Sequence, residues 1–229
     1  MSAASGMGNA EPTRVRKMVV FFAVREEAKY FQPPAPDCQV IVSGIGKANA
    51  QRALLKSIDG GSPQLVLTCG FAGGLNPRFK RGDVVFEADA NCTFSNTLAK
   101  LGATAGKFHC ADRIITTVSE KQVQWKATGA DAVEMESGVI RELCRQQGIP
   151  STTIRVISDD ASQDLPMDFN QVSGANGNIN YLKLAGTLLK SPGLVPKLMR
   201  FQRELDVCSR NLGDTLNRFV VEAIRVQSP

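Results

Sequence analysis

The chain has 229 residues, of which 43% are hydrophobic, and its formal net charge is +5. This length fits one compact α/β domain, alone or with an appendage. The positive charges form no basic stripe interleaved with aromatic side chains, so we expect no nucleic-acid partner.

Histidine and cysteine usage argues against metal chemistry. The six cysteines form no C-x-x-C pair, and the only histidine is His109. We therefore expect no metal site and no cofactor. Residues 1–12 lack the apolar core of a secretory signal, and no apolar run reaches the roughly 20 residues of a membrane span. These features predict a soluble, cytoplasmic protein.

The first half of the chain alternates apolar runs with amphipathic segments. Continuous apolar runs predict buried strands at 18–24, 39–44 and 64–70. Helical patterns lie between them, at 26–31 and 47–58. The helix at 47–58 is followed by two glycines, which are typical of a helix end.

The second half continues this alternation. Apolar, β-rich runs predict strands at 82–90, 113–118 and 152–160, and residues 138–148 have a helical apolar rhythm that ends at Gly148. Strands separated by helices indicate an α/β fold with a central mixed, mostly parallel sheet that helices flank.

Composition divides the chain into three parts. Residues 1–14 are small and polar and are predicted to be a disordered tail. Residues 15–177 are predicted to form the α/β domain. Residues 178–229 have a helical pattern throughout, and we expect a C-terminal helical appendage that packs on or beside the domain.

Two motifs follow predicted strands, at the sheet edge where open α/β sheets bind ligands. "TCGFAGGL" (68–75) contains three glycines, whose backbone amides can face a ligand, although a structural turn explains it equally well. "RVISDD" (155–160) delivers Ser158 and Asp159 to the same edge. A carboxylate at that point is either a helix N-cap or a proton donor.

The stretch "AVEMES" (132–137) carries two acids at the mouth of a predicted helix. Acids in a first turn complement the helix dipole, which explains Glu134 but not Glu136. Glu26 and Glu27 follow the first strand and meet the same sheet edge as Asp159. This convergence of acids is not explained by helix capping.

The motifs "AVREE", "CGFAGGL", "VEMES" and "RVISD" occur in this order between about residues 18 and 170. In order and spacing they resemble the purine nucleoside phosphorylase and methylthioadenosine/adenosylhomocysteine nucleosidase superfamily. The resemblance implies a three-layer nucleoside phosphorylase-like fold, a small-molecule purine nucleoside as ligand, and a homo-oligomer.

The resemblance also implies a role for each matching residue. Asp159 is the acid that protonates, or hydrogen-bonds, the purine N7, and Glu27 rather than Glu26 positions the attacking water. Glu136 accepts the ribose hydroxyls. The superfamily's base-stacking aromatic is missing near "DRIIT", so the backbone near Ile114 is expected to contact the base. The implied substrate-binding residues are Gly70, Phe71, Ala72, Gly73, Ile114, Met135, Glu136 and Ser158.

Three functions stay open at this stage. The preferred one is a nucleosidase that cleaves the N-glycosidic bond of an adenosyl-type purine nucleoside with water. The alternative is a phosphate-dependent purine nucleoside phosphorylase, for which Arg25 is the one candidate phosphate ligand, because the strand at 64–70 has no arginine. The second alternative is a non-catalytic nucleoside-binding protein.

The C-terminal segment suggests a lipid substrate or contact with a lipid surface. The short stretch between Phe86 and Arg113, the glycine loop and the long basic-apolar helices together resemble the hopanoid-associated branch of the superfamily. Members of that branch are implicated in removing adenine from an adenosyl-lipid. Residues 181–202 alternate apolar and basic side chains, which predicts weak contact with a membrane surface and a peripheral location. Packing against the domain or a partner subunit is the competing interpretation.

Overall fold

The computed structural model describes residues 18–33, 38–89, 94–172, 174 and 180–227. The predicted tail at 1–14 lies outside these residues. Within them, no helix is both long enough and apolar enough to cross a membrane.

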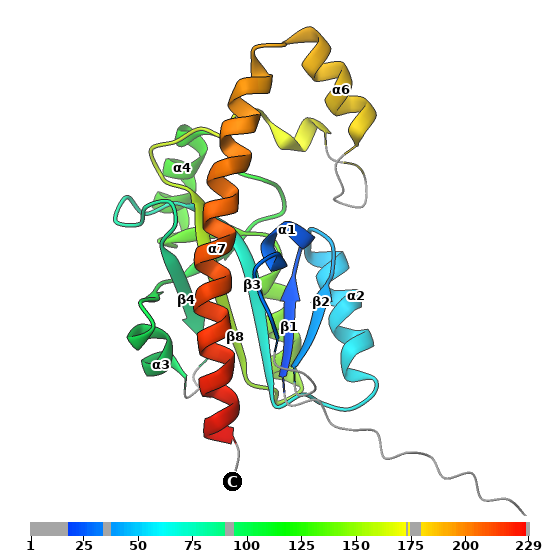
Figure 1. Ribbon diagram of the computed structural model, residues 1–229, viewed down its shortest axis with the longest axis vertical. Helices are drawn as coiled ribbons and strands as arrows, with labels where there is room; N and C mark the ends of the chain where they lie inside the picture. The colour runs from blue at the N-terminus through cyan, green and yellow to red at the C-terminus, as the bar shows by residue number, and fades with distance from the viewer. Residues whose placement is uncertain (1–17, 34–37, 90–93, 173, 175–179, 228–229) are drawn as a thin grey trace, which may run out of the picture.

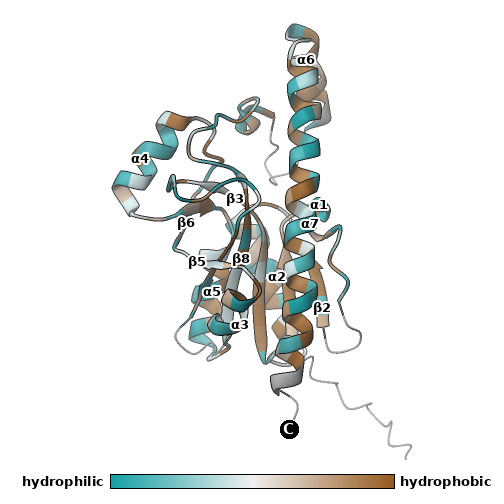
Figure 2. Cartoon of the chain, turned by 60° about the vertical axis from the view of Figure 1, so that its left-hand side comes forward, coloured by the Kyte–Doolittle hydropathy of each residue, from teal (hydrophilic) through white to brown (hydrophobic). Residues whose placement is uncertain are grey.

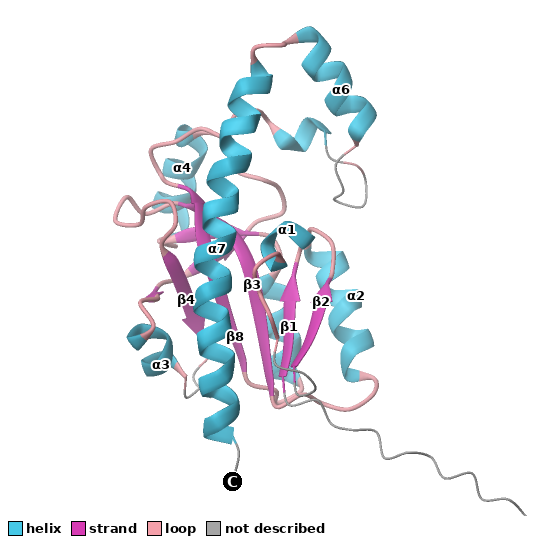
Figure 3. Cartoon of the chain, in the orientation of Figure 1, coloured by secondary structure: helices cyan, strands magenta, loops and turns pink. Residues whose placement is uncertain are grey.

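An eight-stranded sheet forms the centre of the molecule (Figure 1, Figure 3). Six strands follow the order β2-β1-β3-β8-β4-β5, while β7 pairs with β3 and β6 pairs with β7. The pairing of β4 with β8 and of β7 with β3 is antiparallel, and the remaining pairs are parallel. The predicted mixed, mostly parallel sheet is therefore confirmed. The strands are β1 (Met18–Phe22), β2 (Cys38–Val42), β3 (Leu65–Gly74), β4 (Val84–Ala88), β5 (Thr104–Ala105), β6 (Phe108–Cys110), β7 (Ala132–Glu134) and β8 (Ser151–Asp159).

Helices cover both faces of the sheet. Strand β1 is apolar at every position because its alternate side chains enter two different cores. Val19 and Phe21 pack with α2 and α5, whereas Met18, Val20 and Phe22 pack with α7. The helices are α1 (Arg25–Ala28), α2 (Lys47–Ile58), α3 (Ser95–Lys100), α4 (Val118–Thr128), α5 (Ser137–Gln146), the 3₁₀ turn η1 (Phe169–Val172), α6 (Tyr181–Lys190) and α7 (Leu194–Gln227).

The two halves of α7 have different surroundings. Its C-terminal half contributes Leu212, Leu216 and Phe219 to the same core as β1. Its N-terminal half extends with α6 past the end of the sheet (Figure 1), and hydrophobic and hydrophilic residues alternate along it (Figure 2). The last helix thus belongs to the core at one end and overhangs the sheet edge at the other.

One predicted strand is wrong. Residues 113–117 form a loop that leads into α4, although "RIITTV" is rich in β-branched residues. Their backbone finds other partners, because Thr116 N and Thr117 N donate to the Glu120 carboxylate, while the Thr117 hydroxyl accepts from Glu120 N. This capping box starts a helix where the β propensity predicted a strand.

Candidate active site

A cavity of about 630 Å³ lies where β1, β3, β7 and β8 end. Because β1, β3 and β8 are parallel neighbours, their carboxyl ends meet at one edge of the sheet. The predicted site residues that line this cavity are Glu27, Phe71, Ala72, Gly73, Ile114, Met135, Glu136, Ser158 and Asp159. Gly70 and Arg25 are not among the lining residues, and Arg25 is exposed.

Glu27 is held inside the cavity wall by backbone amides. Its Oε2 accepts from Ala23 N at 2.8 Å and Val24 N at 3.1 Å, and its Oε1 accepts from Phe71 N at 2.8 Å. Burial raises the pKa of Glu27 to about 7, although the nearby Arg155 guanidinium opposes this rise. The carboxyl group is therefore fixed in place, with a pKa well above that of an exposed glutamate.

Gly70 does not line the cavity but contacts the charged side chains behind its wall. Its φ of +149° is rarely adopted by other residues, and a Cβ at this position would collide with the Glu27 carboxylate and the Arg155 guanidinium. The glycine loop thus lets two charged side chains approach the β3 backbone closely.

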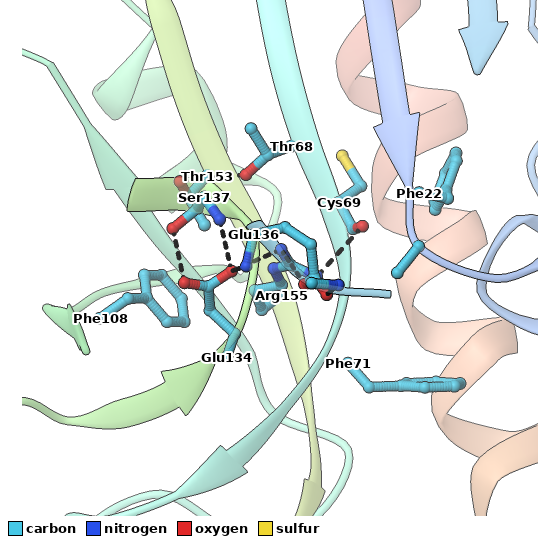
Figure 4. A network of polar contacts seen from close by, with 12 residues as sticks. Phe22, Thr68, Cys69, Phe71, Phe108, Glu134, Glu136, Ser137, Thr153 and Arg155 are labelled. Carbon is cyan, nitrogen blue, oxygen red and sulfur yellow. Dashed lines mark hydrogen bonds and ion pairs between the residues drawn. The ribbon is translucent and has the colours of Figure 1, made fainter. Parts of the chain in front are cut away.

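Glu134 is the last residue of β7, and its carboxylate contacts the start of α5 (Figure 4). Its Oε2 accepts from Glu136 N at 2.9 Å and Ser137 N at 2.7 Å, and its Oε1 accepts from the Ser137 hydroxyl at 2.9 Å. These contacts satisfy amides at the helix start, although Glu134 lies before the N-cap and not in the first turn that the sequence predicted. Glu134 also accepts from Arg155 Nη2 at 2.7 Å, a partner that the sequence did not reveal.

Glu136 faces the cavity from the N-cap position of α5. Its Oε1 accepts from Gly46 N at 2.9 Å, and its Oε2 lies 3.3 Å from Arg155 Nη2. Burial raises the pKa of this carboxyl, and Arg155 opposes the rise. The loop at 44–46, with the sequence "GIG", therefore contributes a backbone amide to the site.

Arg155 is the centre of this acidic cluster (Figure 4). It is 1% exposed and pairs directly with Glu134 and Glu136. Glu27 is close enough to raise the Arg155 pKa. Sequence reasoning missed this residue. An arginine inside the apolar strand "TTIRVIS" was the available signal, because a buried guanidinium requires carboxylate or carbonyl partners.

Asp159 forms a separate polar group. The Ser158 hydroxyl donates to Asp159 Oδ1 at 2.5 Å, and Lys121 Nζ pairs with Oδ2 at 2.5 Å. Burial raises the pKa of Asp159, while Lys121 and Ser158 oppose the rise. Lys121 was also missed, because a lysine is ordinarily exposed.

Aromatic residues line the cavity at positions that the sequence did not indicate. Phe169 and Phe201 have ring centroids 6.0 Å apart and lie in the cavity wall with Leu165 and Leu205. Both backbone groups of Ile114 already bond with the Asn170 side chain, at 3.0 and 2.9 Å. Contact between Ile114 and a ligand would therefore fall to its side chain rather than to its backbone.

Comparisons with known proteins show the family of this chain. The family model described as Phosphorylase superfamily matches residues 34–101 and 87–185. The chain is 25% identical over 205 residues to the 5'-methylthioadenosine/S-adenosylhomocysteine nucleosidase of Buchnera aphidicola subsp. Acyrthosiphon pisum (strain APS), covering 72% of this chain and 88% of the relative. It is 28% identical over 169 residues to the nucleosidase of the same name from Shewanella halifaxensis, covering 59% of this chain and 74% of the relative.

Solved structures share the fold at lower identity. Futalosine hydrolase of Helicobacter pylori has a TM-score of 0.63 at 20% identity, covering 91% of this chain and 98% of that one. The methylthioadenosine/adenosylhomocysteine nucleosidase from Colwellia psychrerythraea in complex with adenine has a TM-score of 0.62 at 18% identity, covering 91% and 96%. The family match, which spans more than half of the chain, shows that this protein belongs to the Phosphorylase superfamily.

Proposed function

We propose that the protein is a nucleosidase that cleaves the N-glycosidic bond of an adenosyl-type purine nucleoside with water. The observation that carries this proposal is the convergence of Glu27, Glu136 and Asp159 on one cavity of about 630 Å³. This volume lies within the ~300–1,000 Å³ of small-molecule sites. The nucleosidase names of the curated relatives support the same reaction.

Asp159 is the proposed acid for the leaving base. Cleavage leaves the electron pair of the glycosidic bond on the purine, which departs more readily when a ring nitrogen is protonated. Burial raises the pKa of Asp159, which favours a carboxylic acid that can donate. A positioned acid contributes a rate factor of ~10² to 10⁴.

Glu136 is the proposed acceptor for the ribose hydroxyls. As the base leaves, the sugar becomes cation-like, so a fixed carboxylate beside it is favourable in the transition state. The Gly46 amide and Arg155 fix Glu136, which limits the reorganisation needed during the reaction. We place Met135 against the sugar, because it is half-buried and lines the same cavity.

Glu27 is the proposed partner of the attacking water. With a pKa raised to about 7, it holds enough carboxylate at neutral pH to accept a proton from water. A carboxylate that activates water on one face while an acid assists departure is the arrangement of an inverting glycosidase.

The charges of the cavity favour water over phosphate. Arg155 is committed to the glutamate cluster, and Arg113, which lines the cavity, pairs with Glu120 at 2.6 Å. A phosphate would meet Glu27, and the exposed Arg25 is not among the residues that line the cavity. This distribution supports hydrolysis rather than phosphorolysis.

The apolar end of the cavity supports a substrate with an apolar substituent, including an adenosyl-lipid. Phe169, Phe201 and Leu205 form this end. Nearby, α6 exposes Leu182 by 87% and Leu189 by 85%, with Lys183 and Lys190 beside them in the sequence. Exposed leucines next to lysines support weak contact of 181–202 with an anionic membrane surface, and hence a cytoplasmic protein that is peripheral to a membrane.

We also propose that the protein self-associates. Val42 and Leu55 are exposed apolar residues on β2 and α2, beside the open edge of the sheet. An exposed apolar edge is often covered in symmetric oligomers. Sedimentation equilibrium tests this, and a monomer at all accessible concentrations would contradict it.

The activity itself is tested by base release. Methylthioadenosine, adenosine, inosine and adenosylhomocysteine are each incubated with the purified protein, with and without inorganic phosphate. We expect adenine release from at least one adenosyl nucleoside at the same rate in both buffers. Strict phosphate dependence would identify a phosphorylase, and no release from any nucleoside would favour a nucleoside-binding protein.

A further inference from the structure

Lys121 is buried in α4, a helix whose other residues are exposed or half-buried. Of the residues of α4, all of which the structure describes, it alone is buried, and it is 0% exposed. Burying an ammonium group is costly unless its donors are all satisfied. The position of Lys121 therefore needs a specific explanation.

The ammonium group has three oxygen neighbours, one at the end of β8 and two in the loop after it. Lys121 Nζ donates to Asp160 O at 2.7 Å and Gln163 O at 2.7 Å, and it pairs with Asp159 Oδ2 at 2.5 Å. Two of the three contacts are hydrogen bonds to carbonyls, and the third is an ion pair with the carboxylate. Two carbonyl contacts alone would explain a loop anchor, but the third contact reaches a carboxylate that lines the cavity.

Hydrogen bonds join the segment at the start of α4 to the loop after β8. Leu165 N donates to Thr116 O at 2.8 Å, and Val118 N donates to the Asp164 carboxylate at 2.6 Å. Ile115 and Leu165, one from each segment, both line the cavity. Lys121 thus connects Asp159 to the two joined segments that line this side of the cavity.

Other groups near Asp159 are bound elsewhere. Arg81 Nε donates to Ser158 O at 2.9 Å, and its guanidinium pairs with Glu204 on α7 at 2.8 Å. The Cys208 thiol, also on α7, donates to Ile157 O. Ser158 is a neutral donor to Oδ1. Lys121 is accordingly the cation in direct contact with the acid.

We propose that Lys121 is the positioning residue of the catalytic acid, which holds Asp159 at the cavity wall and stabilises the carboxylate left after proton transfer. In that step the Asp159 O–H bond breaks, a bond to a base nitrogen forms, and the glycosidic electron pair stays with the departing base. The new negative charge on Asp159 lies beside the ammonium. This role rests on the proposed nucleosidase function.

The test compares K121M with K121R and with K126M, a control at an exposed position of the same helix. K121M should lower kcat for adenine release by about 100-fold with little change in KM, because the acid loses its fixed position. It should also move the alkaline limb of the kcat profile to higher pH, since no ammonium then favours the carboxylate. K121R should keep the limb near its wild-type position, and K126M should change neither quantity.

A double-mutant cycle separates this role from a structural one. If Lys121 acts through Asp159, K121M should cause no further loss of kcat in a D159N background. Wild-type kcat in K121M, an additive loss in the double variant, or an equal loss at every pH with an unmoved limb would overturn the proposal. If K121M does not fold, K121Q replaces it, and loss of the fold in both would show that the role is structural.

A measurement without turnover separates failure of this proposal from failure of the proposed function. If the wild-type protein releases no base, the function fails first. The carbon-13 resonance of the Asp159 carboxyl, assigned with D159N, then reports the contact directly. It should titrate at lower pH in the wild-type protein than in K121M. Identical titration in both proteins would overturn the proposal.

Discussion

Two buried ion clusters border the cavity, and they differ in how well their charges balance. On one side Arg155 is surrounded by Glu27, Glu134 and Glu136. On the other side Asp159 has its own cation, Lys121. The first cluster contains more carboxylates than cations, so its acids are costly to ionise, whereas the second is neutral as a pair. The surplus acids suit a cation-like sugar, because its positive charge favours their ionised form. On the other side, burial raises the pKa of Asp159, which favours a proton donor, and Lys121 opposes this rise.

The largest effect on turnover is expected at Asp159, on the side of the cavity that is proposed to bind the purine base. Asp159→Asn should lower kcat by ~10² to 10⁴ and change KM little, because the shape remains and the transferable proton is lost. The matched control is Asp160→Asn. Asp160 accepts from Ser162 N and the Ser162 hydroxyl and is not among the residues that line the cavity. Near-normal turnover in Asp159→Asn would remove the acid assignment and make Asp160 the next candidate.

The excess of carboxylates around Arg155 should appear in the pH dependence of the free energy of unfolding. The pKa of Glu27 rises from 4.5 to about 7 on folding, so between these values the folded state binds more protons than the unfolded state. The free energy of unfolding should therefore fall as pH rises from 4.5 to 7, by at most about 3 kcal/mol.

Glu27→Gln should make this slope shallower without removing it, because burial also raises the pKa of Glu136 and Asp159, and its turnover should fall. Urea denaturation at several pH values measures both proteins. A wild-type stability that is flat or rises across this window would contradict the raised pKa.

The sequence predicted the parts of this site that follow strands. The runs at 18–24, 64–70 and 152–160 appear as β1, β3 and β8, and the residues after them meet at one edge because parallel strands end together. The residues that balance charge were not predicted. Arg155 and Lys121 pair with acids far away in the chain, and only the fold brings them into contact.

The aromatic wall was missed for a related reason. Phe169 lies after the last strand, and Phe201 lies in α7, within the segment 181–202 whose apolar and basic pattern predicted membrane contact rather than a cavity wall. Their pairing depends on how α7 overhangs the sheet edge. The failed strand at 113–117 has a local cause instead, because the Thr117–Glu120 capping box overrides β propensity.

A smaller effect should separate the two glutamates of "VEMES". Glu134→Gln should lower the free energy of unfolding by about 2 kcal/mol, because two amides and Arg155 lose a charged acceptor. Glu136→Gln should lower kcat/KM by about 10- to 100-fold, because its carboxylate faces the cavity. Thermal or urea unfolding and steady-state kinetics of both variants test this division. Interchanged results would show that Glu134 rather than Glu136 binds the sugar.

The smallest effect concerns the overhanging end of the molecule. We expect weak co-sedimentation with anionic liposomes, which added salt reduces, because each basic residue near the surface contributes about 1 kcal/mol. A Leu182→Ser, Leu189→Ser variant should bind less, since both leucines are exposed. The control is Val123→Ser, an exposed apolar position on α4. Absence of binding at low salt would exclude membrane contact.

The division of the cavity into a sugar side and a base side is tested most directly by a crystal structure of the Asp159→Asn variant with methylthioadenosine. We predict that the ribose hydroxyls lie within hydrogen-bond distance of Glu136 and that a purine ring nitrogen faces residue 159. A nucleoside bound in the reverse orientation, or outside the cavity, would contradict the account.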